Sequence, residues 1–278
     1  MTFLSFCCIM GVEILSTAEV FGMKKWICLI LSFTLTLTMA VIPMTAFSAS
    51  HIVSTENPAF TYEILEDETI RIRGVNSRMV QSYPLVIPET LDGYTVTMVG
   101  GFDLPKPGGL VLPKTVKHLY EWSFEGLYVG ELYLPEGLET ISYHIYDEGD
   151  NIVIPRSVTS IEMRAFGWGG TPTTLAGQPL PPGTITHTPG FTVYSDGNEV
   201  ARAYAESEGH DYVDLSTFAR GDMDLNATTN TMDALTVLSI ASGDQYGTAV
   251  HRVMADVDRN DTINMMDALL VYREASGE

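Results

Sequence analysis

The chain has 278 residues and a formal net charge of −20 at pH 7, from 35 acidic and 15 basic side chains. Such an acidic surface repels phosphate groups, which argues against nucleic acid and anionic membranes as partners. The three cysteines are Cys7, Cys8 and Cys28, so a cysteine nucleophile and a disulfide framework are excluded from the rest of the chain.

Residues 1–50 have the pattern of a leader. Met23-Lys24-Lys25 begins a basic segment, Trp26 to Ile42 is apolar, and small residues follow around Ala46 and Ala49. This order predicts a secretory signal peptide with Met23 as the true start, and therefore a secreted, extracellular protein with no membrane contact after cleavage. A transmembrane anchor is the alternative, but the apolar run is short and no basic flank follows it.

Residues 51–74 are predicted to form an N-terminal β-hairpin cap. Two alternating apolar runs lie between Phe60 and Gly74, on either side of Glu66-Asp67. The acidic cluster of Glu63, Glu66, Asp67 and Glu68 is more typical of a solvated turn than of a catalytic carboxylate pair, because no apolar pocket accompanies it.

Residues 75–166 contain a repeated pattern of two apolar residues and a proline. The apolar residues that follow at three and six positions, and the aromatic at eleven, keep the same register after three of the prolines. A period of roughly 20–25 residues predicts a solenoid, because one such unit cannot bury its apolar face alone. A generic β-rich domain with proline turns is the alternative. The four units begin at Val86-Ile-Pro88, Val111-Leu-Pro113, Tyr133-Leu-Pro135 and Val153-Ile-Pro155, and the register residues are Val116, Leu119, Phe124, Leu138, Ile141, Tyr146, Val158, Ile161 and Phe166.

These units resemble the leucine-rich repeats of BspA-like bacterial surface proteins, most closely from Val153 to Phe166. The resemblance covers about residues 58–214 and implies a short β-solenoid. Asp92-Gly93-Tyr94 fits the family's usual entry. Residues 191–215 fit its C-terminal cap, with a strand, a short helix that ends near Gly209, and a second strand. Between repeats and cap, residues 167–190 are rich in Gly, Pro and Thr; they predict an insertion without regular helix, with a binding loop as the alternative.

The C-terminal residues 216–278 contain two copies of one loop pattern, beginning at Asp222 and Asp256. Each copy has Asp or Asn at loop positions 1, 3, 5 and 9 and Asp at position 12, which is the oxygen-ligand spacing of an EF-hand calcium loop. The alternative is a polar turn with chance acids, but two copies in register that each precede an apolar run favour two Ca²⁺ sites. The predicted ligands are Asp222, Asp224, Asn226, Thr228, Asn230, Asp233, Asp256, Asp258, Asn260, Thr262, Asn264 and Asp267.

This duplicated segment resembles a type I dockerin, the calcium module that binds cohesin domains of a cellulosome scaffoldin. The resemblance implies a helix after each loop, at about 231–241 and 265–275, and no helix before it. It also implies a cohesin-binding surface made of Thr231, Met232, Leu238, Ser239, Met265, Met266, Tyr272 and Arg273.

The two loops depart from the family's pattern in three ways: at position 6, at position 8, and at positions 10 and 11, which are Thr-Met in the first copy and Met-Met in the second. Loop position 6 is usually Gly but is Ala227 in the first copy and Asp261 in the second. A left-handed Ala costs roughly 1–2 kcal/mol, whereas Asp tolerates this conformation better. Position 8 is Thr229 in the first copy and Ile263 in the second, which weakens the apolar contact between the loops. We therefore expect the first calcium site to be the weaker one.

No catalytic motif accompanies these modules. The six histidines are scattered, and neither a nucleophile elbow, a phosphate-binding loop nor a His-Glu-x-x-His pattern is present. The fold class predicted is α+β, a short leucine-rich-repeat solenoid followed by a small all-α dockerin. The function predicted is that of a non-catalytic protein of a cell-surface cellulosome-like complex, whose repeats bind an unknown protein or glycan. A dockerin-bearing hydrolase with an unrecognised active site and a free adhesin are the alternatives.

Overall fold

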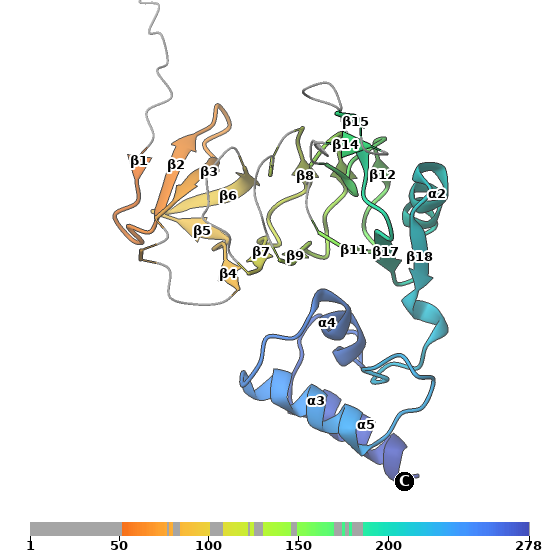
Figure 1. The fold of residues 1–278 in the computed structure, drawn as a ribbon. Helices are drawn as coiled ribbons and strands as arrows, with labels where there is room; N and C mark the ends of the chain where they lie inside the picture. The colour runs from red at the N-terminus through yellow and green to blue at the C-terminus, as the bar shows by residue number, and fades with distance from the viewer. Residues whose placement is uncertain are drawn as a thin grey trace, which may run out of the picture. The chain divides into compact units, whose positions relative to one another are not determined.

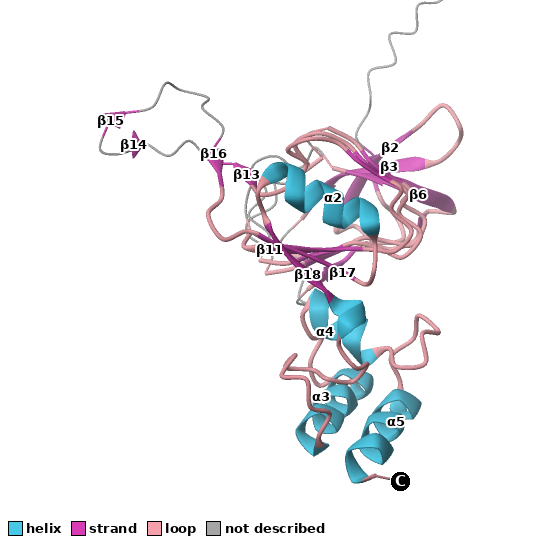
Figure 2. Ribbon diagram, turned by 90° about the vertical axis from the view of Figure 1, so that its right-hand side faces the viewer, coloured by secondary structure: helices cyan, strands magenta, loops and turns pink. Residues whose placement is uncertain are grey.

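The computed structural model describes residues 52–76, 78–79, 84–100, 108–121, 123–124, 130–145, 149–169, 174–175, 178–179 and 186–277. The predicted leader lies outside these ranges. The described chain has an α+β fold, with β-sheets preceding most of the helices (Figures 1 and 2). In these ranges, no helix combines the length and the apolar character that a bilayer span requires.

The N-terminal part is a five-stranded sheet in the order β1-β2-β3-β6-β5. The predicted hairpin is present, because β2 and β3 pair antiparallel and bury alternate side chains such as Ile70 and Ile72. Asp92, in the turn between β5 and β6, has a φ of 51° and accepts hydrogen bonds from the backbone of Thr55 and Glu56 and from the Tyr62 hydroxyl. This carboxylate therefore ties the start of the described chain to the sheet. The strands are β1 (Ile52–Val53), β2 (Phe60–Ile64), β3 (Ile70–Val75), β5 (Thr90–Leu91) and β6 (Tyr94–Val99).

The repeats form two parallel ladders of two-residue strands. The first has the order β4-β7-β9 and the second the order β12-β10-β8. The register residues point into the core, where Phe124 and Phe166 are buried; Ile161 is half-buried and Tyr146 lies outside the described residues. Each unit thus buries its apolar side against its neighbours, as stacked repeats require. The strands are β4 (Leu85–Val86), β7 (Leu110–Val111), β8 (His118–Leu119), β9 (Leu132–Tyr133), β10 (Thr140–Ile141) and β12 (Ser160–Ile161).

The predicted C-terminal cap of the repeats contains β17, β18 and the helix α2 (Glu199–Glu208), and its strands extend β11 of the last repeat into a parallel sheet in the order β11-β17-β18. Asn198 caps the N-terminus of α2, and Gly209 ends the helix in a left-handed conformation with φ of 73°. The strands are β11 (Asn151–Ile154), β17 (Thr192–Ser195) and β18 (Asp211–Asp214). In the predicted insertion, β13 (Trp168–Gly169) pairs with β16 (Thr186–His187), and β14 (Thr174–Leu175) pairs with β15 (Gln178–Pro179).

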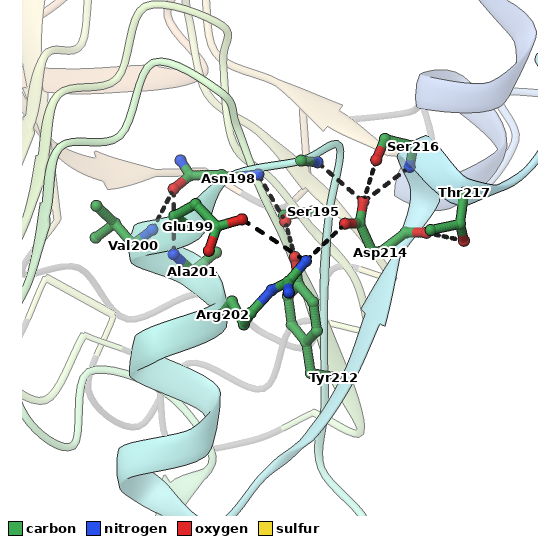
Figure 3. Close-up of polar contacts among 11 residues, drawn as sticks. Ser195, Asn198, Glu199, Val200, Ala201, Arg202, Tyr212, Asp214, Ser216 and Thr217 are labelled. Carbon is green, nitrogen blue, oxygen red and sulfur yellow. Dashed lines mark hydrogen bonds and ion pairs between the residues drawn. The ribbon is translucent and has the colours of Figure 1, made fainter.

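A polar network joins α2 to the end of the cap (Figure 3). The Arg202 guanidinium donates to the Asp214 carboxylate at 3.0 Å and lies 3.7 Å from the Glu199 carboxylate. Asp214 in turn accepts from the Ser216 backbone N–H and so caps the 3₁₀ helix η2 (Leu215–Thr217). These bonds lower the pKa of Asp214: the Ser216 hydroxyl contributes most and outweighs the opposing effect of burial. The network fixes the point where the chain leaves the cap.

Three helices follow, α3 (Thr231–Ser242), α4 (Ala249–Ala255) and α5 (Met265–Ser276). The helices α3 and α5 pack against each other and bury Val237 and Val271. Their positions agree with the two helices predicted after the loops. The helix α4 contradicts the expectation that no helix precedes a loop, because it ends directly before the second loop. Thr248 caps its N-terminus and Met254 is buried, so the cap and the apolar packing explain its formation.

Residues 50–278 form one compact unit. A second apolar cluster includes both strand residues of the repeats, such as Tyr133 and Val153, and buried residues of the C-terminal helices, such as Val237 and Val271. The Tyr133 hydroxyl donates to the carbonyl oxygen of Gly247 at 2.8 Å. Asp196 in the cap forms an ion pair with Arg220, which precedes the first loop.

Candidate metal-binding loops and exposed helix face

Three carboxylates converge in each of the two loops. In the first loop they belong to Asp222, Asp224 and Asp233, and in the second to Asp256, Asp258 and Asp267. In each group, one carboxylate oxygen per residue lies within 4.8 Å of the others. A cation that binds oxygens at about 2.3–2.6 Å places opposite ligands at most about 5 Å apart, so each group can reach a single ion.

The backbone of the first loop is folded around its first carboxylate. The two carboxylate oxygens of Asp222 accept from the backbone N–H groups of Asn226 at 3.2 Å and Ala227 at 2.8 Å. The Asn226 side-chain oxygen accepts in turn from the Thr228 N–H at 2.8 Å. These short-range bonds are the reason that Asp and Asn at alternate positions shape a loop.

The second loop repeats this pattern bond for bond. Asp256 accepts from the N–H groups of Asn260 at 3.1 Å and Asp261 at 3.0 Å. The Asn260 side chain accepts from the Thr262 N–H at 2.8 Å. Because the two loops differ at several other positions, the shared bonds depend on the Asp and Asn residues that the pattern has in common.

The acidic residue at position 12 closes each loop onto its helix. Asp233 accepts from the N–H of Met223 at 3.0 Å and from that of Asn230 at 2.9 Å; Asp267 accepts from Val257 and Asn264, both at 2.9 Å. In both copies the Asn at position 9 caps the helix, so that each helix begins with a capping box. Both acids are buried, and their bonds fix the helix start relative to the first carboxylate.

The donor set of the loops suits a hard divalent cation, because carboxylate and amide oxygens are the ligands that such ions prefer. Asp222 is buried. Burial raises the pKa of its carboxyl, and the neighbouring Asp224 acts in the same direction, whereas the N–H groups of Ala227 and Asn226 lower it. A bound cation would offset the repulsion among these crowded carboxylates. The predicted carbonyl ligands are Thr228 and Thr262; in the structure these carbonyls accept weakly from Asn230 and Asn264, at 3.5 and 3.1 Å.

Both loops have two left-handed residues, at positions 4 and 6. Ala227 and Asp261 have φ of 64° and 62°, and Leu225 and Arg259 have φ of 56° and 60°. The left-handed conformation expected at position 6 is therefore present, and position 4 adds a second one that the sequence pattern does not indicate. Asp tolerates this conformation better than Ala, so at position 6 the first loop, with Ala227, carries more strain than the second, with Asp261.

The helices α3 and α5 expose a set of large apolar side chains. Met232 at 66%, Met265 at 63% and Met266 at 53% are among the most exposed apolar residues of the described chain. Of the other residues predicted to bind a cohesin, Thr231, Tyr272 and Arg273 are exposed, whereas Leu238 and Ser239 are half-buried. Leu238 packs against the second apolar cluster, so it contributes more to the core than the sequence pattern suggests.

Two further residues of this face are not in the predicted set. Leu235 is 55% exposed and Leu269 is 43% exposed, and they occupy equivalent positions in the two copies. Leu235 lies three residues after Met232, and Leu269 lies four residues after Met265 and three before Tyr272, so these side chains share one face of each helix. Their helical spacing from the predicted residues could have placed both leucines on this face. We name Met232, Leu235, Met265, Met266, Leu269 and Tyr272 the apolar helix face.

No protein-family model matches the chain. No curated protein matches it either. Among solved structures, the chain is similar to a leucine-rich repeat protein from Bacteroides ovatus, with 17% sequence identity and a TM-score of 0.26. That similarity covers 39% of this chain and 37% of the length of the Bacteroides protein. The repeats of this chain are defined by their own parallel strand ladders, β4-β7-β9 and β12-β10-β8.

Proposed function

We propose that this is a secreted, non-catalytic interaction protein whose C-terminal module, residues 216–278, binds two Ca²⁺ ions and docks onto a cohesin domain of a scaffoldin. In this proposal the repeats present a binding surface for a protein or glycan, and the module attaches that surface to a cellulosome-like complex. Calcium orders the loops, so docking requires it.

The observation that carries this proposal is the duplication of one loop and helix unit with the same apolar face. Each loop gathers three carboxylates within 4.8 Å, and the helix that follows it exposes methionine and leucine side chains. Exposed apolar groups at equivalent positions on two helices favour a protein partner, because a solvated helix gains nothing from them. Methionine suits such a contact, since its flexible side chain adapts to the partner.

Calcium is favoured over other divalent ions by the ligand set. Asp and Asn oxygens with backbone carbonyls match the irregular coordination of six to eight oxygens that Ca²⁺ accepts, whereas Mg²⁺ demands a near-octahedral shell and keeps several waters. When bound, the ion supplies positive charge that holds Asp222, Asp224 and Asp233 together, and the corresponding acids of the second loop. Asp233 and Asp267 then connect each loop to the helix that follows it.

The test is calorimetric titration of the chain with a panel of cohesins, in calcium and in chelator. The expected result is binding in calcium that chelator abolishes and that the double substitution Met265→Asp with Leu269→Asp weakens at least tenfold. Met163→Asp is the matched control, because Met163 is a 68% exposed methionine in the repeats, and it should bind as the unsubstituted chain does. Calcium binding with no affinity for any cohesin would reject docking and leave the free adhesin.

A further inference from the structure

His187 and His210 are far apart in the sequence, but the fold brings their imidazoles into contact. Nε2 of His187 lies 2.8 Å from Nδ1 of His210. The two rings are nearly parallel, with centroids 4.7 Å apart and an interplanar angle of 21°. His187 ends β16, at the return of the 167–190 segment, whereas His210 joins α2 to β18. The pair therefore connects β16 to the cap of the repeats.

The hydrogen-bond partners determine which ring nitrogens carry protons. Nε2 of His210 lies 3.1 Å from the carbonyl oxygen of Phe166, and a carbonyl can only accept. Nε2 of His210 therefore carries the hydrogen, and Nδ1 of the neutral ring is left as an acceptor. His187 must then donate through its Nε2–H. With His210 neutral, Nδ1 of His210 accepts from His187. A proton on Nδ1 of His210 keeps the contact only if Nε2 of His187 becomes the acceptor, whereas protons on both facing nitrogens break it.

The surroundings favour the neutral form of His210. Burial lowers the pKa of His210 and the neighbouring His187 lowers it further, whereas the Phe166 carbonyl and the carboxylates of Glu208 and Asp211 raise it. The effect of burial is the largest. His210 is 8% exposed.

Two other titratable groups and the close approach of the backbone complete this environment. Tyr204 packs against His210, with ring centroids 5.7 Å apart. The Arg164 guanidinium lies 5.0 Å from the centre of the Trp168 ring. The Trp168 ring in turn contacts His187. The backbone at Gly167, with φ of 71°, approaches so closely that a Cβ there would lie 2.5 Å from the His210 ring. Glycine is required at this position, because another residue would be strained at this positive φ and its Cβ would collide with the His210 ring.

We propose that His187 and His210 form an acid-released clasp that holds β16 to the cap of the repeats. When acid protonates both rings, two N–H groups face each other across 2.8 Å, so the hydrogen bond is lost and the two charged rings repel. This inference goes beyond the proposed docking function and does not depend on it.

The sign of the pH dependence follows from the lowered pKa of His210. The unfolded or released ring has a pKa of about 6.5 and takes up a proton more readily than the clasped ring. The stabilisation is therefore fully present above pH of about 6.5 and is lost as the pH falls below that value toward the lower pKa of the clasped form.

The test is amide hydrogen exchange by NMR on the chain, followed through the Thr188 N–H, which donates to the Gly167 carbonyl at 2.8 Å. Between pH 7.5 and pH 5, its protection factor should fall, because the clasped form binds protons less readily than the released form. The Val193 amide in β17 is the internal reference and should keep its protection. Unchanged protection of Thr188 over this range would overturn the proposal.

A substitution gives a second, independent readout. His187→Phe removes the donor but keeps a flat ring, so Thr188 protection should already be low at pH 7.5 and should no longer depend on pH. The matched control is His118→Gln, because His118 is an exposed histidine that bonds to Thr140 on the repeat ladder, and it should retain the pH dependence of the unsubstituted chain. Retention of that dependence in His187→Phe would also reject the clasp.

Discussion

The repeats and the C-terminal module bury opposite kinds of side chain. The repeats bury leucine, isoleucine, valine and phenylalanine in stacked units, whereas the module buries Asp222, Asp233 and Asp267 beside a small apolar cluster. Buried apolar groups gain free energy without any ligand, but crowded buried carboxylates are costly unless they are neutralised. We therefore expect the repeats to fold independently of calcium and the module to depend on it.

The largest expected effect is on the repeats. Phe166 is fully buried in their core, so Phe166→Ala should lower the free energy of unfolding by about 3–5 kcal/mol. Urea denaturation followed by tryptophan fluorescence measures this, because all three tryptophans precede the C-terminal module. The exposed neighbour provides the control: Met163→Ala should change stability by no more than about 0.5 kcal/mol. A comparable loss in both variants would contradict the assigned core.

The second effect separates the two regions. Calcium at about ten times the dissociation constants of both sites should stabilise the module by about 2.8 kcal/mol, about 1.4 kcal/mol from each site, and leave the repeats unchanged. Far-UV circular dichroism in urea reports mainly the helices, and tryptophan fluorescence reports the repeats. The double substitution Asp222→Ala with Asp256→Ala should remove the gain. An equal gain by both probes would mean that calcium acts on the whole unit rather than on the loops.

A third prediction compares the two loops. Ala227 has a left-handed φ of 64°, so Ala227→Gly should stabilise the calcium-bound module by about 1 kcal/mol and tighten the first site. Asp261→Gly is the matched substitution at φ of 62°, and it should gain less because Asp tolerates this conformation. Calorimetric calcium titration of both variants measures the difference. A larger gain at Asp261 would reverse the predicted order of the two sites.

The smallest effect is expected at the surface of the cap. Arg202→Gln removes the ion pair with Asp214, and because Arg202 is 40% exposed the loss should be no more than about 1 kcal/mol. Thermal denaturation at low and high salt checks this, since a solvated ion pair weakens with ionic strength. A loss of several kcal/mol would show that the network in Figure 3 contributes more than an exposed pair can.

Local patterns predicted most of the elements. The alternating residues from Phe60 to Gly74 predicted the hairpin, and the repeat register predicted Phe124 and Phe166 in the core. The resemblance of the two loops to a known calcium module implied the helices at Thr231 and Met265. In each case the information lies within about one repeat or one helix of sequence, where hydrophobic periodicity and capping residues are sufficient. The domain boundaries and the metal ligands remain predictions.

What the sequence did not reveal depends on contacts between distant segments or on a short helix. The helix α4 has seven residues, too few for a clear periodicity. The exposure of Leu235 and Leu269, and the half-burial of Leu238, depend on how α3 and α5 pack together. The pairing of His187 with His210 joins two segments that no local pattern connects.

Hydrogen exchange by mass spectrometry on the chain, in calcium and in chelator, measures the dependence of the module on calcium. Removal of calcium should increase deuterium uptake in peptides that cover the two loops, α3 and α5, while peptides from the repeat core around Ile141 and Phe166 keep their protection. Equal protection of the loops and helices in both conditions would contradict the claim that metal-neutralised carboxylates, rather than apolar burial alone, hold this module together.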